Sequence, residues 1–249
     1  MEHKAFTLAE ILITLGIIGV VAAMTLPALI TKNRDKELVS RVKKTYSNIQ
    51  NATLFAQKEY GVIGDNSFLF DSTRGVAAVT TDFAKYFNGA RVCQSKTTKG
   101  CEPYYYKLKY TSKRETAAGG GTAAEFSLNG PKIILNDGAI LSVVELTPNC
   151  DNTRTENKYN SDGTVQTDKD GNVVQWQNHI TYCAIVRFDV NGPKNPNQFG
   201  ADAYGIIIYK SKMKPDLWSA GGGESLKSIL TGKGNLTYTP YNIGQQYDF

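Results

Sequence analysis

The feature that most constrains this chain is an uncharged apolar run close to its N-terminus. Residues 11–30 read ILITLGIIGVVAAMTLPALI, with no charged side chain among them. At a rise of about 1.5 Å per residue, a helix of this length spans the roughly 30 Å hydrocarbon core of a bilayer. The mean hydropathy of the whole chain is nevertheless −0.32. We therefore expect one membrane-embedded helix attached to a water-soluble part.

Two other interpretations of the run fit less well. A secretory signal peptide has a basic region before its apolar segment and a small-residue cleavage site after it. Here the polar leader is only MEHKA, Glu10 lies at the head of the run, and the following TKNRDKELVSRVKK continues the helical pattern without a break. A buried core helix of this length with no charge on any face would be unusual.

Helical periodicity continues beyond the apolar run. A stripe with steps of three and four residues predicts one face of an amphipathic helix, and it consists of Leu38, Val42, Tyr46, Ile49, Thr53 and Ala56. The helix is expected to end near Tyr60, with Gly61 as its stop. Pro27 has no backbone N–H, so we expect it to kink or locally melt the apolar half.

The residues after Gly61 are typical of a mixed domain. Asn136-Asp137-Gly138 separates two apolar segments, which predicts a hairpin, and two further strands are expected in ITYCAIVRFDV and AYGIIIYK. Short helices are expected over residues 75–87 and in ESLKSIL, and a flexible joint at residues 119–121. The polar stretch 148–178 is expected to form a small extra hairpin, with turns at Asp162-Gly163 and Asp170-Gly171. The predicted fold is α+β, with the long helix packed on a mainly antiparallel four-stranded sheet.

The N-terminal residues KAFTLAEILITLGIIGVVAAMTLPALI resemble the start of a type IV pilin or type II secretion pseudopilin precursor. In that family a prepilin peptidase cleaves before a Phe and methylates the new amino terminus. The resemblance implies cleavage between Ala5 and Phe6 and N-methylation of Phe6, although Gly is usual where this chain has Ala5. It also implies assembly roles for Glu10, fifth in the mature chain, and for Pro27, at the family's helix-melting position.

The resemblance implies a division into a prepilin leader (1–5), a transmembrane helix (6–30), its amphipathic continuation (31–61) and a globular pilin-like head (62–249). Such a protein is a structural subunit of a type IV pilus or a type II secretion pseudopilus. Its expected partners are further copies of itself through the N-terminal helix, prepilin peptidase, other pilus or secretion subunits, and membrane lipid. It would cross the cytoplasmic (inner) membrane once with its head outside the cytoplasm, and form an extracellular or periplasmic filament. The alternative is a minor pilin-like binding module that captures a surface, DNA or a secreted substrate.

The position of Glu10 agrees with an assembly role on physical grounds. An isolated carboxylate in lipid costs several kcal/mol unless it is paired or protonated. The methylated amine of a neighbouring subunit would neutralise it while stacked apolar helices bury both groups. The alternative is that Glu10 lies at the level of the lipid headgroups, where water solvates it.

Charge and motif content do not favour two other classes of function. The chain carries 28 Lys and Arg against 23 Asp and Glu, and the basic side chains are dense only in KLKYTSKR and KSKMK. This pattern does not favour nucleic acid as the main partner. Only two histidines are present, and no nucleophile elbow, phosphate loop, dinucleotide fingerprint or HExxH motif occurs, so we do not expect an enzyme.

The four cysteines all follow the apolar helix, and none has the CxxC spacing of a zinc site. In a head outside the cytoplasm they would form disulfides. Pairing Cys93 with Cys101 and Cys150 with Cys183 is the chain-local choice among three connectivities, and buried free thiols are the alternative.

An oxygen-rich loop follows the third predicted strand, in FDVNGPKNPNQFGADAY. Asp189, Asn191, Asn197 and Asp202 supply the kind of oxygen donors that Ca²⁺ prefers, although the spacing is not that of an EF-hand. Some major pseudopilins bind calcium in the equivalent loop. The alternative is that these side chains only cap turns that Gly and Pro bend. Residues 168–171, DKDG, are a weaker site of the same type, and no other cofactor is indicated.

Overall fold

The structure is a computed structural model that describes residues 7–113, 125–160 and 164–246. The chain divides into an N-terminal unit, Met1–Glu37, and a C-terminal unit, Leu38–Phe249. The long helix α1, Leu8–Tyr60, contributes to both units. The expected leader at residues 1–5, the joint at 119–121 and the Asp162-Gly163 turn lie outside the described residues.

In the N-terminal unit, α1 exposes apolar side chains on every face. Its most apolar stretch has a mean hydropathy of 2.3 and no buried residue, so the helix is long and apolar enough to cross a membrane. The hydroxyls of Thr14, Thr25 and Thr31 each donate to the backbone carbonyl four residues earlier, at 2.6, 2.9 and 3.0 Å. Because lipid offers no hydrogen-bond partners, hydroxyls bonded within their own helix suit an apolar surrounding. The helix runs through Pro27 without interruption, so the local melting considered for that position does not occur.

In the C-terminal unit, α1 is amphipathic as expected. Its buried residues are Leu38, Val42, Thr45, Ile49, Ala52, Thr53, Ala56 and Gln57.

The predicted end of α1 at Tyr60 is confirmed. The Gly61 N–H donates to the Lys58 carbonyl at 3.2 Å and the Val62 N–H to the Gln57 carbonyl at 2.9 Å. This pair of bonds is a Schellman motif, which requires a positive φ at Gly61, where φ is 70°.

The main sheet has six antiparallel strands, two more than expected, in the order β1-β4-β5-β8-β9-β10. The strands are β1 (Arg91–Cys93), β4 (Lys132–Ile134), β5 (Ile140–Leu146), β8 (Tyr182–Asp189), β9 (Ala203–Tyr209) and β10 (Met213–Pro215). The four central strands are those predicted. The correction concerns the edges, because β1 and β10 are only three residues long and show too little alternation to be recognised.

The predicted hairpin joins β4 and β5. Ile133 lies opposite Leu141 in an antiparallel register. In the turn between the strands, the Gly138 N–H donates to the Leu135 carbonyl at 3.0 Å, and the Leu135 N–H donates to the Ala139 carbonyl at 2.8 Å. Gly138 has a φ of 89°, which explains why glycine occupies this position.

Three helices pack with the main sheet around one core. The second half of α1, α2 (Gly75–Ala84) and α3 (Gly223–Leu230) bury apolar side chains against alternate residues of the central strands. The helices expected over residues 75–87 and in ESLKSIL are thus present, the first with an earlier end. Within the described residues, the head is therefore α+β with a mainly antiparallel sheet.

A separate sheet of two strands was not expected. It pairs β2 (Lys107–Lys109) with β3 (Glu125–Ser127). Beside it the Arg187 guanidinium lies 4.2 Å from the ring centroid of Phe126 and 4.8 Å from that of Trp218. An arginine among aromatic rings keeps its charge while its planar group contributes to packing.

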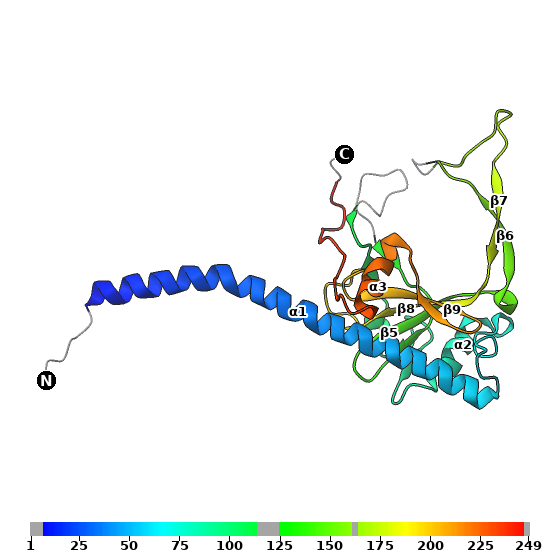
Figure 1. Cartoon of the computed structure of the whole chain (residues 1–249), viewed down its shortest axis with the longest axis horizontal. Coiled ribbons are helices and arrows are strands. Elements are labelled where there is room, and N and C mark those ends of the chain that lie inside the picture. Colours follow the sequence, from blue (N-terminus) through cyan, green and yellow to red (C-terminus); the bar gives the residue numbers. More distant parts are fainter. Residues whose placement is uncertain (1–6, 114–124, 161–163, 247–249) are drawn as a thin grey trace. The chain divides into compact units, whose positions relative to one another are not determined.

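The polar stretch forms the expected extra hairpin. Strands β6 (Asn152–Asn157) and β7 (Gln175–Ile180) pair antiparallel in a sheet of their own. Figure 1 shows them extending away from β5, β8 and β9. Between them, Tyr159 pairs with Val165 and Thr167 with Val173. We call the described residues of 151–180 the arm.

Candidate functional site

At the N-terminal end of α1, Glu10 has a partner within its own chain. The backbone N–H and the hydroxyl of Thr7 donate to Glu10 Oε2 at 2.8 and 2.9 Å, and the Glu10 N–H donates to the Thr7 hydroxyl at 3.2 Å. This reciprocal arrangement is a capping box, which satisfies backbone donors at the start of a helix. The Thr-x-x-Glu pattern that signals such a box is readable in the sequence, but the roles expected for Glu10 did not include it. The predicted cleavage and methylation residues, Ala5 and Phe6, lie outside the described residues.

The four cysteines form two disulfides in the chain-local pairing. Cys93 is bonded to Cys101 and Cys150 to Cys183, and all four side chains are buried. Cys150 lies just before β6, and Cys183 lies in β8 just after β7. The second disulfide therefore joins the residues that flank the two ends of the arm.

The oxygen-rich loop connects β8 to β9, and the first of its carboxylates organises the start of the loop. Asp189 Oδ1 accepts the backbone N–H groups of Asn191 and Gly192 at 3.0 and 2.9 Å. Its Oδ2 accepts the hydroxyl of Tyr106 at 2.8 Å. The Asp189 side chain is buried. These bonds are the turn-capping role that the sequence left as an alternative.

The second carboxylate organises the end of the same loop. Asp202 is fully buried, its Oδ2 accepts the Asn197 N–H at 2.9 Å, and its Oδ1 accepts the Gln198 N–H at 2.8 Å. Within the part of the chain that the structure describes, no cationic side chain pairs with Asp189 or Asp202. Two buried carboxylates thus share one loop without a compensating positive charge.

Burial raises the pKa of both groups, and repulsion from Asp202 raises that of Asp189 further. Burial first, and then the negative charge of Asp202, raise the pKa of Asp189 well above its usual range. Burial raises the pKa of Asp202 to about 6, against the hydrogen bonds from Gln198 and Asn197. A cation in the loop would favour the ionised forms of both.

Two amide oxygens of the loop lack hydrogen-bond donors. Asn191 Nδ2 donates to the Asn195 carbonyl at 3.2 Å, and Asn197 Nδ2 donates to the Pro193 carbonyl at 3.3 Å. The Oδ1 atoms of Asn191 and Asn197 are buried, and neither has a partner among the described residues. A buried acceptor without a partner costs about 1–3 kcal/mol, so these atoms call for an explanation.

The donor set of this loop fits a hard cation. Carboxylate and amide oxygens suit Ca²⁺, whereas softer metals prefer Cys and His. Among the described residues, no group of three or more His, Cys, Asp and Glu side chains gathers at one place. The fit therefore rests on two carboxylates and two amide oxygens.

The weaker site at residues 168–171 is an exposed turn. Asp168 Oδ1 accepts the backbone N–H groups of Asp170 and Asn172, both at 2.9 Å. Its Oδ2 accepts the amide of Asn172 at 3.2 Å. Capping of the turn accounts for both oxygens of Asp168.

Comparisons with known proteins gave no match to a family model, to a curated protein or to a solved structure. The architecture itself, a long apolar N-terminal helix followed by a sheet-rich domain, is compatible with a pilin-like fold.

Proposed function

We propose that this chain is a pilin-like structural subunit of a membrane-rooted filament outside the cytoplasm, either a type IV pilus or a type II secretion pseudopilus. Prepilin peptidase would cleave it between Ala5 and Phe6 and methylate Phe6. The observation that carries the proposal is α1, which exposes apolar side chains on all faces in its first part and buries one stripe in its second.

The first part of α1 needs an apolar surrounding both before and after assembly. Exposed apolar surface of this extent is unfavourable in water. Lipid would cover it in the single subunit, and the helices of neighbouring subunits would cover it in the filament. The two disulfides support a head outside the cytoplasm, where such bonds persist.

In the filament, Glu10 would pair with the methylated amine of a neighbouring Phe6. The bonds from Thr7 end on Glu10 Oε2. An ionised carboxylate has about four acceptor sites on its two oxygens, so Glu10 can keep its capping box and still accept a neighbour's amine. The capping box would then hold the carboxylate in place for that partner.

The capping box allows the charge of Glu10 to be tested apart from its local role. Glu10→Gln removes the charge but retains the box, since glutamine serves equally at this position. Thr7→Ala removes both bonds of the Thr7 hydroxyl, keeps the backbone N–H bond to Glu10, and retains the charge. We expect Glu10→Gln to give folded membrane protein with few or no sheared filaments, because losing one member of a buried ion pair costs about 3–5 kcal/mol. Thr7→Ala should still assemble.

The measurement is the ratio of sheared filaments to membrane-fraction protein, with mass spectrometry of each variant to verify that processing is intact. Normal assembly of Glu10→Gln together with failure of Thr7→Ala would show that Glu10 acts only as a helix cap.

We also propose that the β8–β9 loop binds Ca²⁺ through Asp189, Asn191, Asn197 and Asp202. The support is the set of buried oxygens that lack donors and the two buried carboxylates without a cationic partner. A bound cation would neutralise these carboxylates and stabilise the loop between the two central strands. Its test is given in the Discussion.

A minor pilin-like binding module is the second function that an observation favours. The arm is not needed for a helix-driven filament, and it offers a surface for capture. The share of this chain in purified filaments separates the two functions, since a structural subunit dominates the mass. We propose neither a catalytic role nor nucleic acid as a partner.

A further inference from the structure

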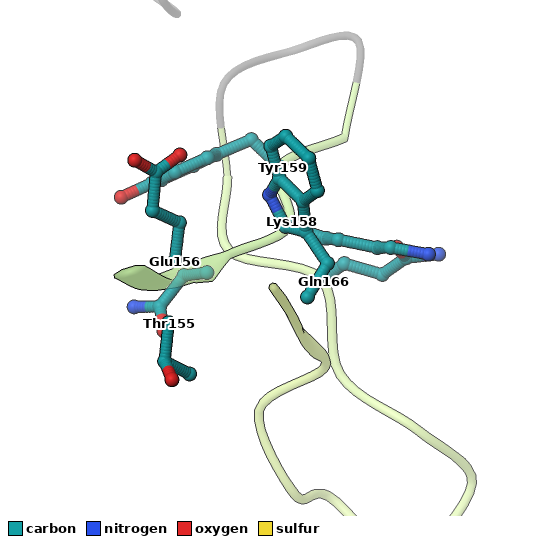
Figure 2. A pocket seen from close by; sticks show the side chains of 7 residues that line it. Thr155, Glu156, Lys158, Tyr159 and Gln166 are labelled. Carbon is teal, nitrogen blue, oxygen red and sulfur yellow. The ribbon is translucent and has the colours of Figure 1, made fainter. Parts of the chain in front are cut away.

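The arm contains an open pocket that the filament proposal does not use. Its volume is about 640 Å³, within the range of about 300–1,000 Å³ that is typical of sites for small ligands. The lining residues are Thr155, Glu156, Asn157, Lys158, Tyr159, Gln166 and Trp176. Figure 2 shows the side chains of these residues together.

Hydrogen bonds across the strands hold the polar side chains of the pocket. Gln175 Nε2 donates to Asn157 Oδ1 at 3.0 Å, and Gln177 Nε2 donates to Thr155 Oγ1 at 2.9 Å. The Gln166 N–H donates to the Lys158 carbonyl at 2.8 Å. This bond joins the segment that leads back to β7 to the residue just after β6. Side chains and backbone fixed in advance lose less entropy when a ligand binds.

Two aromatic side chains of the pocket are exposed. Trp176 is 43% exposed and Tyr159 is 63% exposed. Trp and Tyr combine a large apolar face with a polar hydrogen-bonding atom, which is why they are enriched at interfaces. In contrast, Trp218, the other tryptophan of the chain, packs against Phe126 and Phe199.

The charge of the arm does not suit a polyanion. Among the described arm residues, three basic side chains stand against four acidic ones, a net charge of −1: Arg154, Lys158 and Lys169 against Asp151, Glu156, Asp168 and Asp170. Within the pocket, one acidic side chain balances one basic one. Nucleic acid and heavily sulfated glycans favour clustered positive charge, which the described surface of the arm lacks.

We propose that this pocket binds a neutral oligosaccharide. A sugar ring presents a face of C–H groups that can lie on Trp176 or Tyr159. Its hydroxyls both donate and accept, as the amides of Asn157 and Gln166 and the hydroxyl of Thr155 do. The inference uses only the location of the head outside the cytoplasm from the proposed function, and does not depend on filament formation.

The test uses the full-length chain in a zwitterionic, sugar-free detergent on an array of neutral, sialylated and sulfated oligosaccharides. We expect neutral members of the array to be bound. Calorimetric titration with the strongest of them should show at least about a tenfold loss of affinity for Trp176→Ala and a smaller loss for Trp176→Phe, which keeps a ring. Val173→Ala is the matched control, because Val173 is an exposed arm residue outside the pocket.

Three results would overturn the inference: no binding to any neutral oligosaccharide, preference for the acidic ones, or equal affinities of Trp176→Ala and the parent chain. A fourth is loss of filaments by Trp176→Ala without any sugar binding, which would make the arm a contact between copies of the chain. Each leaves the filament proposal intact, because the Glu10 and Thr7 variants test that proposal with an unchanged arm.

Discussion

Single buried residues determine how the stability of the head depends on pH and ions. In the β8–β9 loop, Asp189 and Asp202 are buried with a raised pKa. On β4, Lys132 is 1% exposed, and its Nζ donates to the Leu128 carbonyl at 2.7 Å and lies 4.7 Å from the ring centroid of Tyr105. Burial lowers the pKa of Lys132 to about 8. The two carboxyls should make the free energy of unfolding fall as pH rises, and Lys132 should make it rise. The two effects belong to different pH ranges.

Calcium should stabilise the head at neutral pH and reduce its response to acid. Without calcium, the native carboxyls bind protons at higher pH than the unfolded ones, so stability should fall as pH rises from about 4 through 6 and above. Adding calcium at neutral pH should raise the melting temperature. At a hundredfold excess of calcium over Kd, the free energy of unfolding should increase by about 2.7 kcal/mol. Asp189→Ala should abolish this gain. An unchanged melting temperature in millimolar calcium would leave the loop as a turn without a cation.

Lys132 should make the head more stable at alkaline pH. Its native pKa of about 8 lies below that of an unfolded lysine, so the unfolded state binds more protons between about pH 8 and pH 10. Stability should therefore rise across this window, by at most about 3 kcal/mol. Denaturant unfolding of the full chain at both ends of the window measures the slope. Lys132→Met should remove it, whatever its effect on absolute stability, and an unchanged slope would assign the effect to other groups.

At the scale of elements, local signals were predictable from sequence and distant pairings were not. The Asp137-Gly138 turn specifies the β4–β5 hairpin within a few residues, and Gly61 specifies the end of α1. Strands of three residues, such as β1, β2, β3 and β10, carry too few side chains to show a period, so only their partners define them. Composition located the oxygen-rich loop, but the buried amide oxygens of Asn191 and Asn197 depend on packing that no sequence pattern shows.

The two disulfides should contribute unequally to stability. In the chain-entropy account, the bond that closes the longer loop removes more freedom from the unfolded chain. Cys150–Cys183 spans 33 residues and Cys93–Cys101 spans 8. Replacing both cysteines of the longer bridge with Ser should therefore cost about 1 kcal/mol more than the same change in the shorter one. Chemical unfolding of the two double variants compares them directly, and an equal or reversed cost would contradict the loop-length argument.

At the scale of the whole molecule, the two parts of α1 differ in what they contact. The second part packs in the core of the head, while the first part exposes apolar side chains on every face and is long and apolar enough to cross a membrane. Assembly of such subunits would exchange lipid contacts for helix contacts without refolding the head. The account therefore depends on whether the chain is processed as a filament subunit.

Mass spectrometry of the N-terminus of the native protein tests this central claim most directly. If the proposed function is right, the chain begins at Phe6 and carries a methyl group on its amine, because residues 5–10 resemble the processing motif of pilin precursors apart from Ala5. Protein recovered from the membrane or from filaments with an intact Met1 terminus, or with a cut elsewhere, would contradict it.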